Sequence, residues 1–320
     1  MLRLMRWISL RLGRAPARVV LAGISLYFLL FAPAARAASR AYLRRALGRE
    51  PRFADQFRHF HSFASTIHDR VFLLNARFDL FQLEVHGEAI IQDMLAAGRG
   101  AFLMGAHMGS FEVARALGRR QPGLKMAMVM YPDNARKLNA ALAAINPAAV
   151  QEIIPLGQID SMLRVQAALD DGTVLGVLGD RSLGGEPTVR APFLGADAEF
   201  PLGPMRLAAM LKRPVLFMSG LYLGGNRYAI HFEPLADFSE IDRPGRNAAI
   251  EAAVTAYAAC LQRHCRAAPY NWFNFFDFWR AKASIEPAQS SDGGRSAFRP
   301  TSRSEGRPAV AGDGCRGNKP

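Results

Sequence analysis

Cysteine is scarce in this sequence, with three residues among 320. So few thiols exclude a fold held together by a disulfide framework, and a small odd number is typical of a reducing compartment. Cys260 and Cys265 flank His264, but thiols five residues apart on a predicted helix face different ways, and Cys315 lies in a polar C-terminal stretch. We therefore expect no disulfide, no bound metal and no cofactor.

Acidic residues are absent from residues 1–49, which contain ten Arg. The whole chain carries a net charge of +13, whereas residues 50–283 contain 24 basic and 23 acidic residues. The excess positive charge therefore belongs to one end of the chain, and the body is almost neutral. This distribution favours a membrane surface over nucleic acid, because anionic lipids attract basic residues next to an apolar segment by about 1 kcal/mol each. We expect membrane lipids as partners and no nucleic acid.

Long hydrophobic runs are also lacking, apart from residues 19–35, which carry no charge between Arg18 and Arg36. Seventeen residues is the lower limit for a membrane-spanning helix, and Pro33 shortens the run. More Arg follow Arg36, and positive charge after a hydrophobic segment keeps that side in the cytoplasm. We predict a membrane helix over 19–35 and a body on the cytoplasmic face of the inner membrane.

Four interpretations of this end of the chain stay open: a short anchor, an interfacial helix, a cleaved signal peptide ending at Ala35-Arg36-Ala37, and a buried core helix. Upstream, a helical projection of residues 2–18 separates an apolar arc from most of the Arg, which is typical of an interfacial helix. The apolar arc contains Leu2, Leu4, Met5, Ile8 and Leu12.

The body alternates between short apolar runs and amphipathic windows. Helical spacing covers residues 53–81 as one long or two short helices. Strands are expected at 83–86, 101–105, 125–130, 153–156, 174–178, 215–223 and 228–232, and helices at 88–97, 110–119, 134–145, 159–170, 203–212 and 247–266. This order predicts one α/β domain over residues 50–283, with a central mixed, largely parallel sheet covered by helices on both faces. Residues 284–320 are rich in Ser, Gly, Arg and Pro, which predicts a disordered tail.

Several catalytic motifs are missing. The sequence has no Gly-x-Ser-x-Gly nucleophile elbow and no Gly-x4-Gly-Lys phosphate loop. Gly98-Arg-Gly100 precedes a predicted strand, which is the wrong order for a dinucleotide site. His59, His61 and His68 lack the spacing of metal ligands on one helix face. Serine hydrolase, P-loop and dinucleotide chemistry are therefore not indicated.

The segment Gly105-Ala-His107-Met-Gly109-Ser110-Phe-Glu112 carries the strongest chemical signal. An apolar strand ends at Gly105, and a helix is expected to start at Ser110, so His107 lies at the sheet edge where ligands bind in α/β folds. Glu112, in the first helical turn, is expected to accept a proton from one ring nitrogen of His107, which prepares the other nitrogen to act as a general base. The helix start around Gly109 and Ser110 offers backbone N–H groups for an oxyanion or a phosphate.

These residues resemble the His-x4-Asp/Glu block of the bacterial late acyltransferases of lipid A biosynthesis, a branch of the lysophospholipid and glycerolipid acyltransferase superfamily. The resemblance covers roughly residues 5–282. Its further blocks are Trp7-Ile-Ser-Leu-Arg-Leu-Gly-Arg14, Gly179-Asp180-Arg181, Ala191-Pro-Phe-Leu-Gly195, the run from Phe200 to Met205-Arg206-Leu-Ala, and Asn271-Trp-Phe-Asn-Phe-Phe-Asp-Phe-Trp279. The aromatic closing block resembles a subgroup often linked to aryl polyene, pigment or other specialised lipid pathways.

The resemblance implies transfer of a fatty acyl group from an acyl carrier protein or coenzyme A thioester to a hydroxyl of a membrane-embedded acceptor, without a metal or an acyl-enzyme intermediate. It assigns His107 as general base and Glu112 as its orienting carboxylate. Asp180 and Arg181 are expected to shape the acceptor or thioester site, and Arg136, in Tyr131-Pro-Asp-Asn-Ala-Arg136, to contact polar or phosphorylated groups. Arg190, Gly109 and Ser110 complete the candidate substrate-binding residues.

Acyl transfer is thus the leading hypothesis, with His107 deprotonating the acceptor hydroxyl while backbone N–H groups and an Arg stabilise the oxyanion. Two alternatives remain. The same site could pass the acyl group to water, as a thioesterase or lipid hydrolase. The chain could also be a non-catalytic membrane scaffold that binds lipid through its basic N-terminus and aromatic segments.

Overall fold

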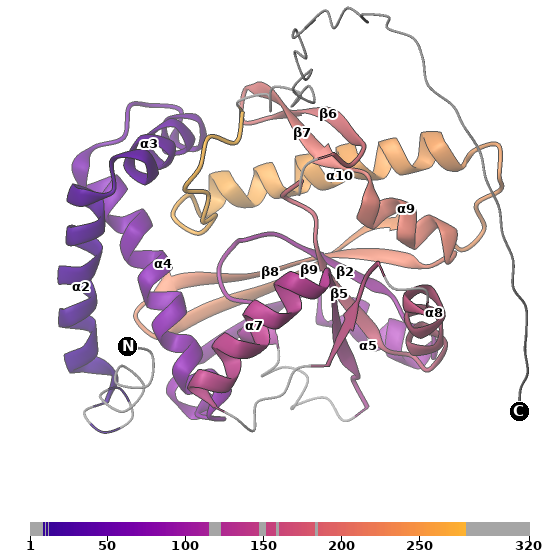
Figure 1. Ribbon diagram of the computed structural model, residues 1–320, viewed down its shortest axis with the longest axis horizontal. Coiled ribbons are helices and arrows are strands. Elements are labelled where there is room, and N and C mark those ends of the chain that lie inside the picture. Colours follow the sequence, from indigo (N-terminus) through magenta and orange to yellow (C-terminus); the bar gives the residue numbers. More distant parts are fainter. Residues whose placement is uncertain are drawn as a thin grey trace, which may run out of the picture. The chain divides into compact units, whose positions relative to one another are not determined.

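A computed structural model describes residues 9, 11, 13–114, 123–146, 152–157, 160–182 and 185–279 (Figure 1). Its centre is a seven-stranded sheet with the order β1-β9-β8-β2-β5-β3-β4. The strands are β1 (Gln82–His86), β2 (Phe102–Gly105), β3 (Met126–Met130), β4 (Ile153–Pro155), β5 (Val174–Leu178), β8 (Pro214–Gly224) and β9 (Arg227–Asp237). The neighbours are parallel except β8 and β9, which form an antiparallel hairpin. The expected α/β class and its mixed, mostly parallel sheet are confirmed.

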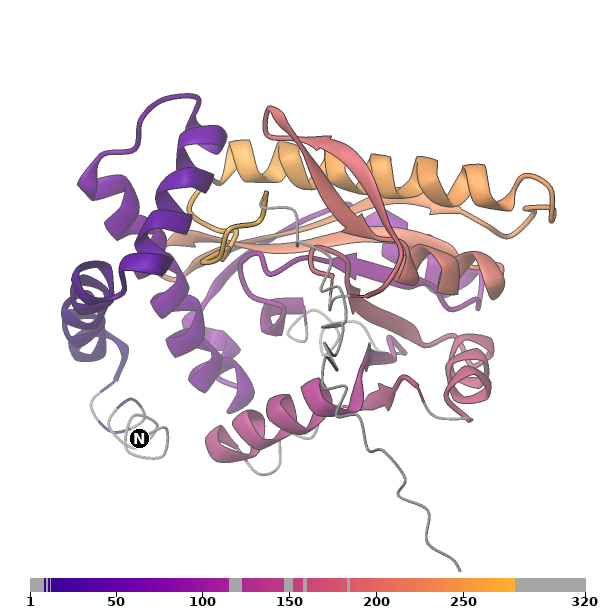
Figure 2. The ribbon, with the colours of Figure 1, turned by 45° about the horizontal axis from the view of Figure 1, so that its top comes forward.

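Helices cover both faces of the sheet (Figure 2). Successive residues of β2 point to opposite sides, so Phe102 belongs to a core shared with α10 (Arg246–Ala267), whereas Leu103 belongs to a core shared with α4 (Phe53–Leu74) and α5 (Glu88–Ala96). The other covering helices are α7 (Pro132–Ile145), α8 (Ser161–Asp170) and α9 (Gly203–Met210). Burial on both faces explains why the central strands read as continuous apolar runs.

One hairpin was not predicted from the sequence. β6 (Thr188–Phe193) pairs antiparallel with β7 (Ala196–Pro201), outside the central sheet, and packs against α10. A proline in each strand and two acidic residues in β7 hide the usual strand pattern. The turn between them uses two residues with positive φ, Leu194 at 51° and Gly195 at 82°, which is the geometry of tight two-residue hairpin turns.

The apolar N-terminal segment forms two helices where one was expected over 19–35. α2 (Arg14–Phe31) ends at Ala32, and Pro33 begins α3 (Pro33–Leu47), because proline cannot continue a helix but suits its first position. α2 is the one described helix that is long and apolar enough to cross a membrane. The predicted helix over 53–81 is α4 followed by a short 3₁₀ turn at Phe78–Leu80.

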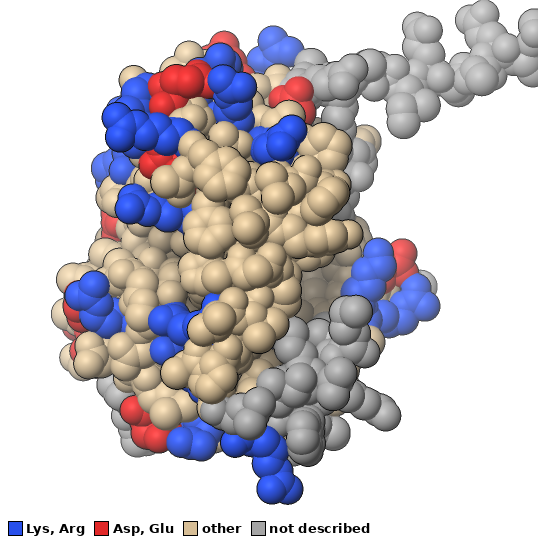
Figure 3. Space-filling model, turned by 90° about the vertical axis from the view of Figure 1, so that its left-hand side faces the viewer, with Lys and Arg blue, Asp and Glu red and all other residues tan. Residues whose placement is uncertain are grey.

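α2 buries only a narrow stripe against α4, formed by Ala17, Leu21, Ser25 and Leu29 at four-residue spacing. Most of its large apolar side chains are exposed, including Val19, Val20, Tyr27, Phe28 and Phe31. Figure 3 shows this side of the molecule as a broad uncharged surface with Lys and Arg at its margins. A helix of this kind is not a core helix of the described body, because a core helix would bury these side chains.

Three predictions fall wholly or partly outside the described residues. They are the interfacial helix over 2–18, of which only residues 9, 11 and 13–18 are described, the part of the helix at 110–119 that follows residue 114, and the tail at 284–320.

Candidate active site

His107 and Asp180 meet at the edge of the sheet because their strands are adjacent and end at the same level. β2 and β5 are parallel, with Gly105 opposite Leu178, and each candidate residue follows its strand end by two positions. His107 Nδ1 lies 2.9 Å from Asp180 Oδ1, and the backbone N–H of His107 donates to Asp180 Oδ2 over 3.0 Å. The carboxylate therefore fixes both the ring and the backbone of His107.

Asp180 is fully buried, whereas 35% of the His107 side chain is exposed. Burial raises the pKa of the Asp180 carboxyl, but the hydrogen bond and charge of His107, the indole of Trp272 and the charge of Arg181 together lower it below its usual value. The group is therefore a carboxylate at neutral pH. A buried carboxylate bound to one ring nitrogen holds the imidazole in one tautomer and leaves Nε2 as the nitrogen that can accept a proton.

The closing segment, residues 271–279 after α10, covers this pair. Trp272 is 1% exposed and donates its indole N–H to Asp180 Oδ2 over 2.9 Å. The backbone N–H of Phe273 donates to the carbonyl of His107, and that of Gly109 donates to the carbonyl of Asn271, each over 2.8 Å. The closing block is thus a structural part of the site, and its aromatic composition reflects packing around Asp180.

Glu112 does not take the position expected for it. Its carboxylate is 2.7 Å from Arg70 Nε on α4 and accepts a hydrogen bond from Ser110 Oγ over 3.1 Å. The carboxylate that accepts the hydrogen bond of the His107 ring belongs to Asp180 instead. The reason is the sheet: the parallel strand β5 delivers a carboxylate directly beside His107, whereas Glu112 lies after a turn in the chain at Gly109, where φ is +62°. Glu112 ties the loop to α4.

The backbone N–H groups expected to bind an anion are already occupied. That of Gly109 donates to Asn271, and that of Ser110 donates to Gly220 over 2.8 Å. Position 109 requires glycine for two reasons. Its φ is +62°, and a Cβ there would lie 1.9 Å from the carbonyl oxygen of Gly220. Both residues anchor the His107 loop to β8 and to the closing segment, so the prediction that they present free donors is wrong.

The three candidate arginines differ in their surroundings. Arg181 is partly buried beside the pair, donates to the carbonyl of Phe273 over 3.0 Å and lies over the ring of Phe276. Burial lowers the pKa of Arg181, and the charge of Asp180 partly offsets that effect. Arg136 pairs with Asp133 one turn earlier on α7 and is highly exposed, and Arg190 pairs with Glu199 across the β6–β7 hairpin at 3.6 Å. The structure therefore brings Arg181 to His107 and Asp180, and holds the other two in surface ion pairs.

Residues 53–281 match the family model of the bacterial lipid A biosynthesis acyltransferases. The chain belongs to this family. The match covers the whole central sheet, the His107 loop, Asp180 and the closing segment, and membership identifies the protein as an acyltransferase. The family implies acceptors of the lipid A type and membrane association. A comparison with curated proteins gives no match.

Two residues of this acyltransferase were missed at the sequence level. Trp272 was assigned to packing or the lipid interface, and Arg70 was not considered. The signal that points to Trp272 is its indole N–H, which needs an acceptor when it is buried, whereas the Phe side chains of the same block need none. Arg70 is one of two arginines on the amphipathic helix α4, a common feature that gives no signal by itself.

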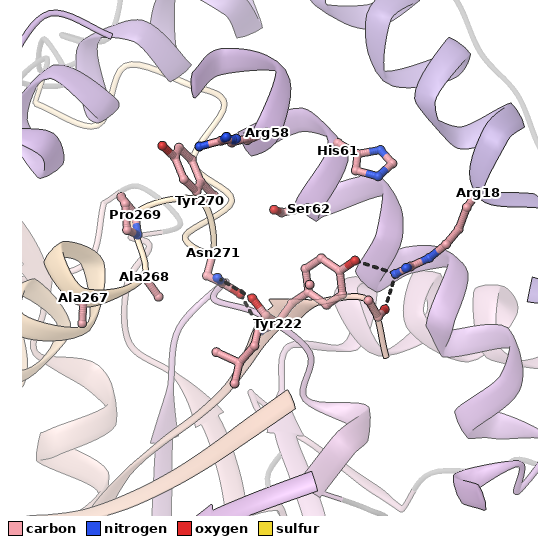
Figure 4. Close-up of a pocket in the computed structure, with 13 residues that line it drawn as sticks. Arg18, Arg58, His61, Ser62, Tyr222, Ala267, Ala268, Pro269, Tyr270 and Asn271 are labelled. Atoms are coloured by element: carbon pink, nitrogen blue, oxygen red, sulfur yellow. Dashed lines mark hydrogen bonds between the residues drawn. The ribbon is translucent and has the colours of Figure 1, made fainter. Parts of the chain in front are cut away.

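An open pocket of about 570 Å³ lies behind the closing segment of the acyltransferase (Figure 4). Its walls come from α2, α4, the β8–β9 turn and the residues after α10. The polar lining residues are Arg18, Arg58, His61, Ser62, Tyr222, Tyr270 and Asn271. Asn271 connects it with the site, since its side chain bonds both backbone groups of Tyr222 and its carbonyl accepts from Gly109.

A mixed cluster between α10 and β9 bears on the expected absence of zinc. Cys260 and His264, one helical turn apart on α10, face Glu233 of β9, and the ligand atoms of all three lie within 4.8 Å of one another. The spacing of Cys260 and Cys265 gives no metal-site signal, whereas Cys260 and His264 form an i, i+4 pair on one helix face. Glu233 is already neutralised by Arg263 and accepts from His264 over 2.7 Å, and burial raises the pKa of the Cys260 thiol to about 12. The absence of a metal stays a prediction.

Proposed function

We propose that this acyltransferase moves a fatty acyl group from an acyl carrier protein or coenzyme A thioester to a hydroxyl of a lipid or glycolipid acceptor, at the cytoplasmic face of the inner membrane. The observation that supports this proposal best is the pairing of a partly exposed imidazole, His107, with a buried carboxylate, Asp180. The exposed nitrogen is positioned for a substrate proton, and no side chain in the described part of the chain hydrogen-bonds to it.

His107 Nε2 removes the proton of the acceptor hydroxyl as its oxygen attacks the thioester carbonyl. A hydroxyl is too weak an acid to ionise first at neutral pH, so proton transfer and attack are concerted. The ring becomes an imidazolium, and Asp180 stabilises its positive charge through Nδ1–H. The C–S bond then breaks, and the leaving thiolate takes the proton back from His107. Asp180 thus takes the supporting role that the sequence assigned to Glu112.

Arg181 is the proposed electrophile for the oxyanion. The backbone N–H groups of His107, Met108, Gly109 and Ser110 all donate within the protein, so they do not supply the hole. The guanidinium of Arg181 uses one nitrogen for Phe273 and has further N–H donors. Partial burial strengthens its interaction with a developing negative charge.

Membrane attachment through α2 is the second part of the proposal. The helix lies along α4 through its buried stripe, and Arg14 in its first turn binds Asp69 of α4, so both ends of α2 stay with the body. Its outward apolar residues enter the lipid, which holds the body against the bilayer as an interfacial helix does. The Arg of α3 then meet the anionic headgroups of the same leaflet.

The chemical proposal is tested with purified enzyme, a fatty acyl thioester of acyl carrier protein and a panel of hydroxylated membrane lipids. Wild-type enzyme is expected to form an acylated lipid, seen by mass spectrometry, and His107→Ala to lose at least about a thousandfold in rate. Full turnover by His107→Ala contradicts the mechanism. Free fatty acid as the sole product indicates a thioesterase, and a lack of any turnover together with lipid binding indicates a scaffold.

The membrane proposal is tested by changing the surface of α2 without its packing. A variant with Val20, Tyr27 and Phe31 all replaced by Ser is expected to leave the membrane fraction while its body stays folded. Leu21→Ser is the matched control, because Leu21 is 5% exposed and its change destabilises the contact with α4. Retention of the triple variant in carbonate-washed membranes contradicts the proposal.

A further inference from the structure

The pocket in Figure 4 contains two arginines whose positive charge no carboxylate of the described residues neutralises. Arg18 comes from the first turns of α2 and Arg58 from α4. Among the described residues, neither forms an ion pair with an Asp or Glu, whereas Arg14, one turn before Arg18, binds the buried Asp69 through two nitrogens at 2.7 and 2.5 Å. On α2, therefore, Arg14 forms a structural ion pair with Asp69, whereas Arg18 lines the pocket.

Arg18 is held in place by neutral groups. Its terminal nitrogen donates to Tyr222 Oη over 2.5 Å and to the carbonyl of Gly225, and its guanidinium lies 5.9 Å from the centre of the Tyr222 ring. Its Nε atom is buried and has no hydrogen-bond partner within the described chain. Nε has almost no exposed surface, so what the guanidinium offers an anion in the pocket is its positive charge, which these neutral groups leave uncompensated.

Arg58 stands on the other wall, with its guanidinium 5.9 Å from the centre of the Tyr270 ring. The carboxylate closest along the helix is Asp55, but Arg49 already binds it at 2.8 and 3.2 Å, and Tyr270 donates to it over 2.7 Å. Arg58 therefore forms no ion pair with Asp55.

The remaining polar groups of the pocket suit an anion as well. Burial, together with the charge of Arg18, lowers the pKa of His61, so this ring is neutral at pH 7 and can donate one N–H. Ser62 adds a hydroxyl at the same wall. The pocket therefore combines two permanent positive charges with neutral donors, a set that matches the oxygen atoms of a phosphate.

The position of the pocket indicates what carries the phosphate. Arg18 directly precedes the exposed apolar residues of α2, which begin with Val19 at 76% exposure. Figure 3 shows the uncharged surface bounded by basic residues on this side of the molecule. An amphiphile with its chains along α2 would place a polar headgroup at the level of Arg18 and Arg58, as snorkelling cations do at a lipid interface.

We propose that this pocket binds the phosphate-bearing headgroup of a membrane lipid, with Arg18 on one wall and Arg58 on the other. The site deepens the proposed function and rests on it in one respect: α2 must lie at the membrane. The phosphate can belong to a bilayer phospholipid or to a phosphorylated acceptor, since both present the same chemistry. Either source places the membrane-derived ligand on the opposite side of Asn271 from the His107 loop.

The binding experiment uses the full-length protein in detergent and dihexanoyl phosphatidic acid, a soluble phosphate-bearing lipid, titrated by calorimetry. Arg18→Gln and Arg58→Gln are each expected to weaken binding at least tenfold. Dihexanoyl glycerol, which lacks the phosphate, is expected to bind at least tenfold more weakly than phosphatidic acid to wild-type protein. Equal affinity of the wild type and both variants, or equal affinity for the two lipids, overturns the proposal.

Matched variants separate the pocket from general surface charge and from folding. Arg99→Gln removes one exposed charge beside Ser239, outside the pocket lining, and is expected to bind as the wild type does. Ser62→Glu adds a negative charge inside the pocket without removing a cation, and is expected to lose binding while its thermal midpoint stays within a few degrees. If Ser62→Glu folds and binds normally, the proposal is wrong.

A final arm identifies the source of the phosphate and separates this site from the chemistry. In acyl transfer assays, Arg58→Gln is compared on a phosphorylated glycolipid acceptor and on its phosphatase-treated form. A raised KM for the phosphorylated form alone supports an acceptor phosphate, whereas weaker binding to phosphatidylglycerol vesicles with an unchanged KM ratio supports a bilayer phosphate. If no acyl transfer occurs with any acceptor but phosphatidic acid binding still depends on Arg18, the proposed function fails and the lipid site stands.

Discussion

The indole N–H of Trp272 donates over 2.9 Å to the carboxylate of Asp180, which lies 92 positions earlier in the chain. The same carboxylate holds His107. Asp180 therefore receives three hydrogen bonds, from the His107 ring, the His107 backbone and the indole. A carboxylate with this many donors is fixed in orientation and kept ionised. Trp272 is a positioning residue, because it acts on the reaction through Asp180.

Trp272→Phe is expected to lower kcat by about tenfold with little change in KM, because the ring volume is kept and one charge-assisted hydrogen bond is lost. Steady-state kinetics with varied acceptor concentration measures the split. Trp279→Phe is the matched control, since its indole N–H donates to the carbonyl of Phe193 and not to Asp180. An equal loss of kcat in both variants would indicate a packing role only.

Asp180→Asn and Glu112→Gln distinguish the two carboxylates. Asp180→Asn is expected to reduce kcat by about a thousandfold or more, because the amide favours the wrong tautomer of His107 and does not stabilise the imidazolium. Glu112→Gln is expected to cost less than about tenfold in kcat and to reduce stability by about 1–3 kcal/mol, because it leaves Arg70 without its carboxylate. The reverse order of kcat losses would return the supporting role to Glu112.

Gly109→Ala is expected to destabilise the fold by more than about 3 kcal/mol, because a Cβ would lie 1.9 Å from the Gly220 carbonyl oxygen and φ is +62°. Gly123→Ala separates the two causes. Its φ is +97°, but nothing lies within 4 Å of a Cβ there, so it tests backbone strain alone. Thermal unfolding followed by circular dichroism should show a much larger drop for Gly109→Ala, and equal drops would rule out the clash.

Acid should weaken the packing of the closing segment through His59. Burial lowers the pKa of His59 to about 4, and its ring joins Ser39 Oγ at 2.8 Å to the carbonyl of Trp272 at 2.9 Å. The unfolded chain binds this proton at its ordinary pKa of 6.5, so the contribution to stability is complete above pH 6.5 and declines as the pH falls towards 4.

The expected loss from this one group is about 2 kcal/mol between pH 7 and pH 5. Denaturant titrations of detergent-solubilised protein at both pH values measure it. His59→Gln should show a smaller difference between the two pH values than the wild type. The buried carboxylates Asp69 and Asp180 have lowered pKa values and contribute only below about pH 4, so they do not interfere. An unchanged pH difference in His59→Gln would contradict the assignment.

The centre of the sheet was predictable because β2, β3, β5 and β8 are buried on both faces, which makes them visible as apolar runs of four or more residues. All seven expected strands are present, with β8 and β9 extending furthest beyond the predicted bounds. The β6–β7 hairpin was not predictable in the same way, since it packs one face on α10 and its sequence contains Pro192, Asp197 and Glu199. Pro33 was expected to shorten the N-terminal helix, but it also begins a second helix, α3.

The chemistry of the site was only partly predictable. His107 followed from the strand-to-turn setting, whereas its partner depends on which strand is adjacent to β2, and spacing along the chain does not contain that information. Glu112 is five residues from His107 in sequence, and Asp180 is 73 residues away, yet Asp180 makes the contact. His107 and Asp180 each lie two residues beyond the end of an apolar strand, and this shared position is the pattern that would have suggested the pair.

The anchoring of the His107 loop by Asn271 and Trp272 has a consequence for synthesis of the protein. Synthesis from the N-terminus completes His107 and Asp180 well before Asn271 and Trp272, so the acid–base pair leaves the ribosome without its final hydrogen bonds. A nascent chain that ends before Trp272 contains His107 and Asp180 but leaves the loop without its contacts at Gly109 and Phe273. The geometry of the pair is therefore complete only when nearly the whole family domain has been made.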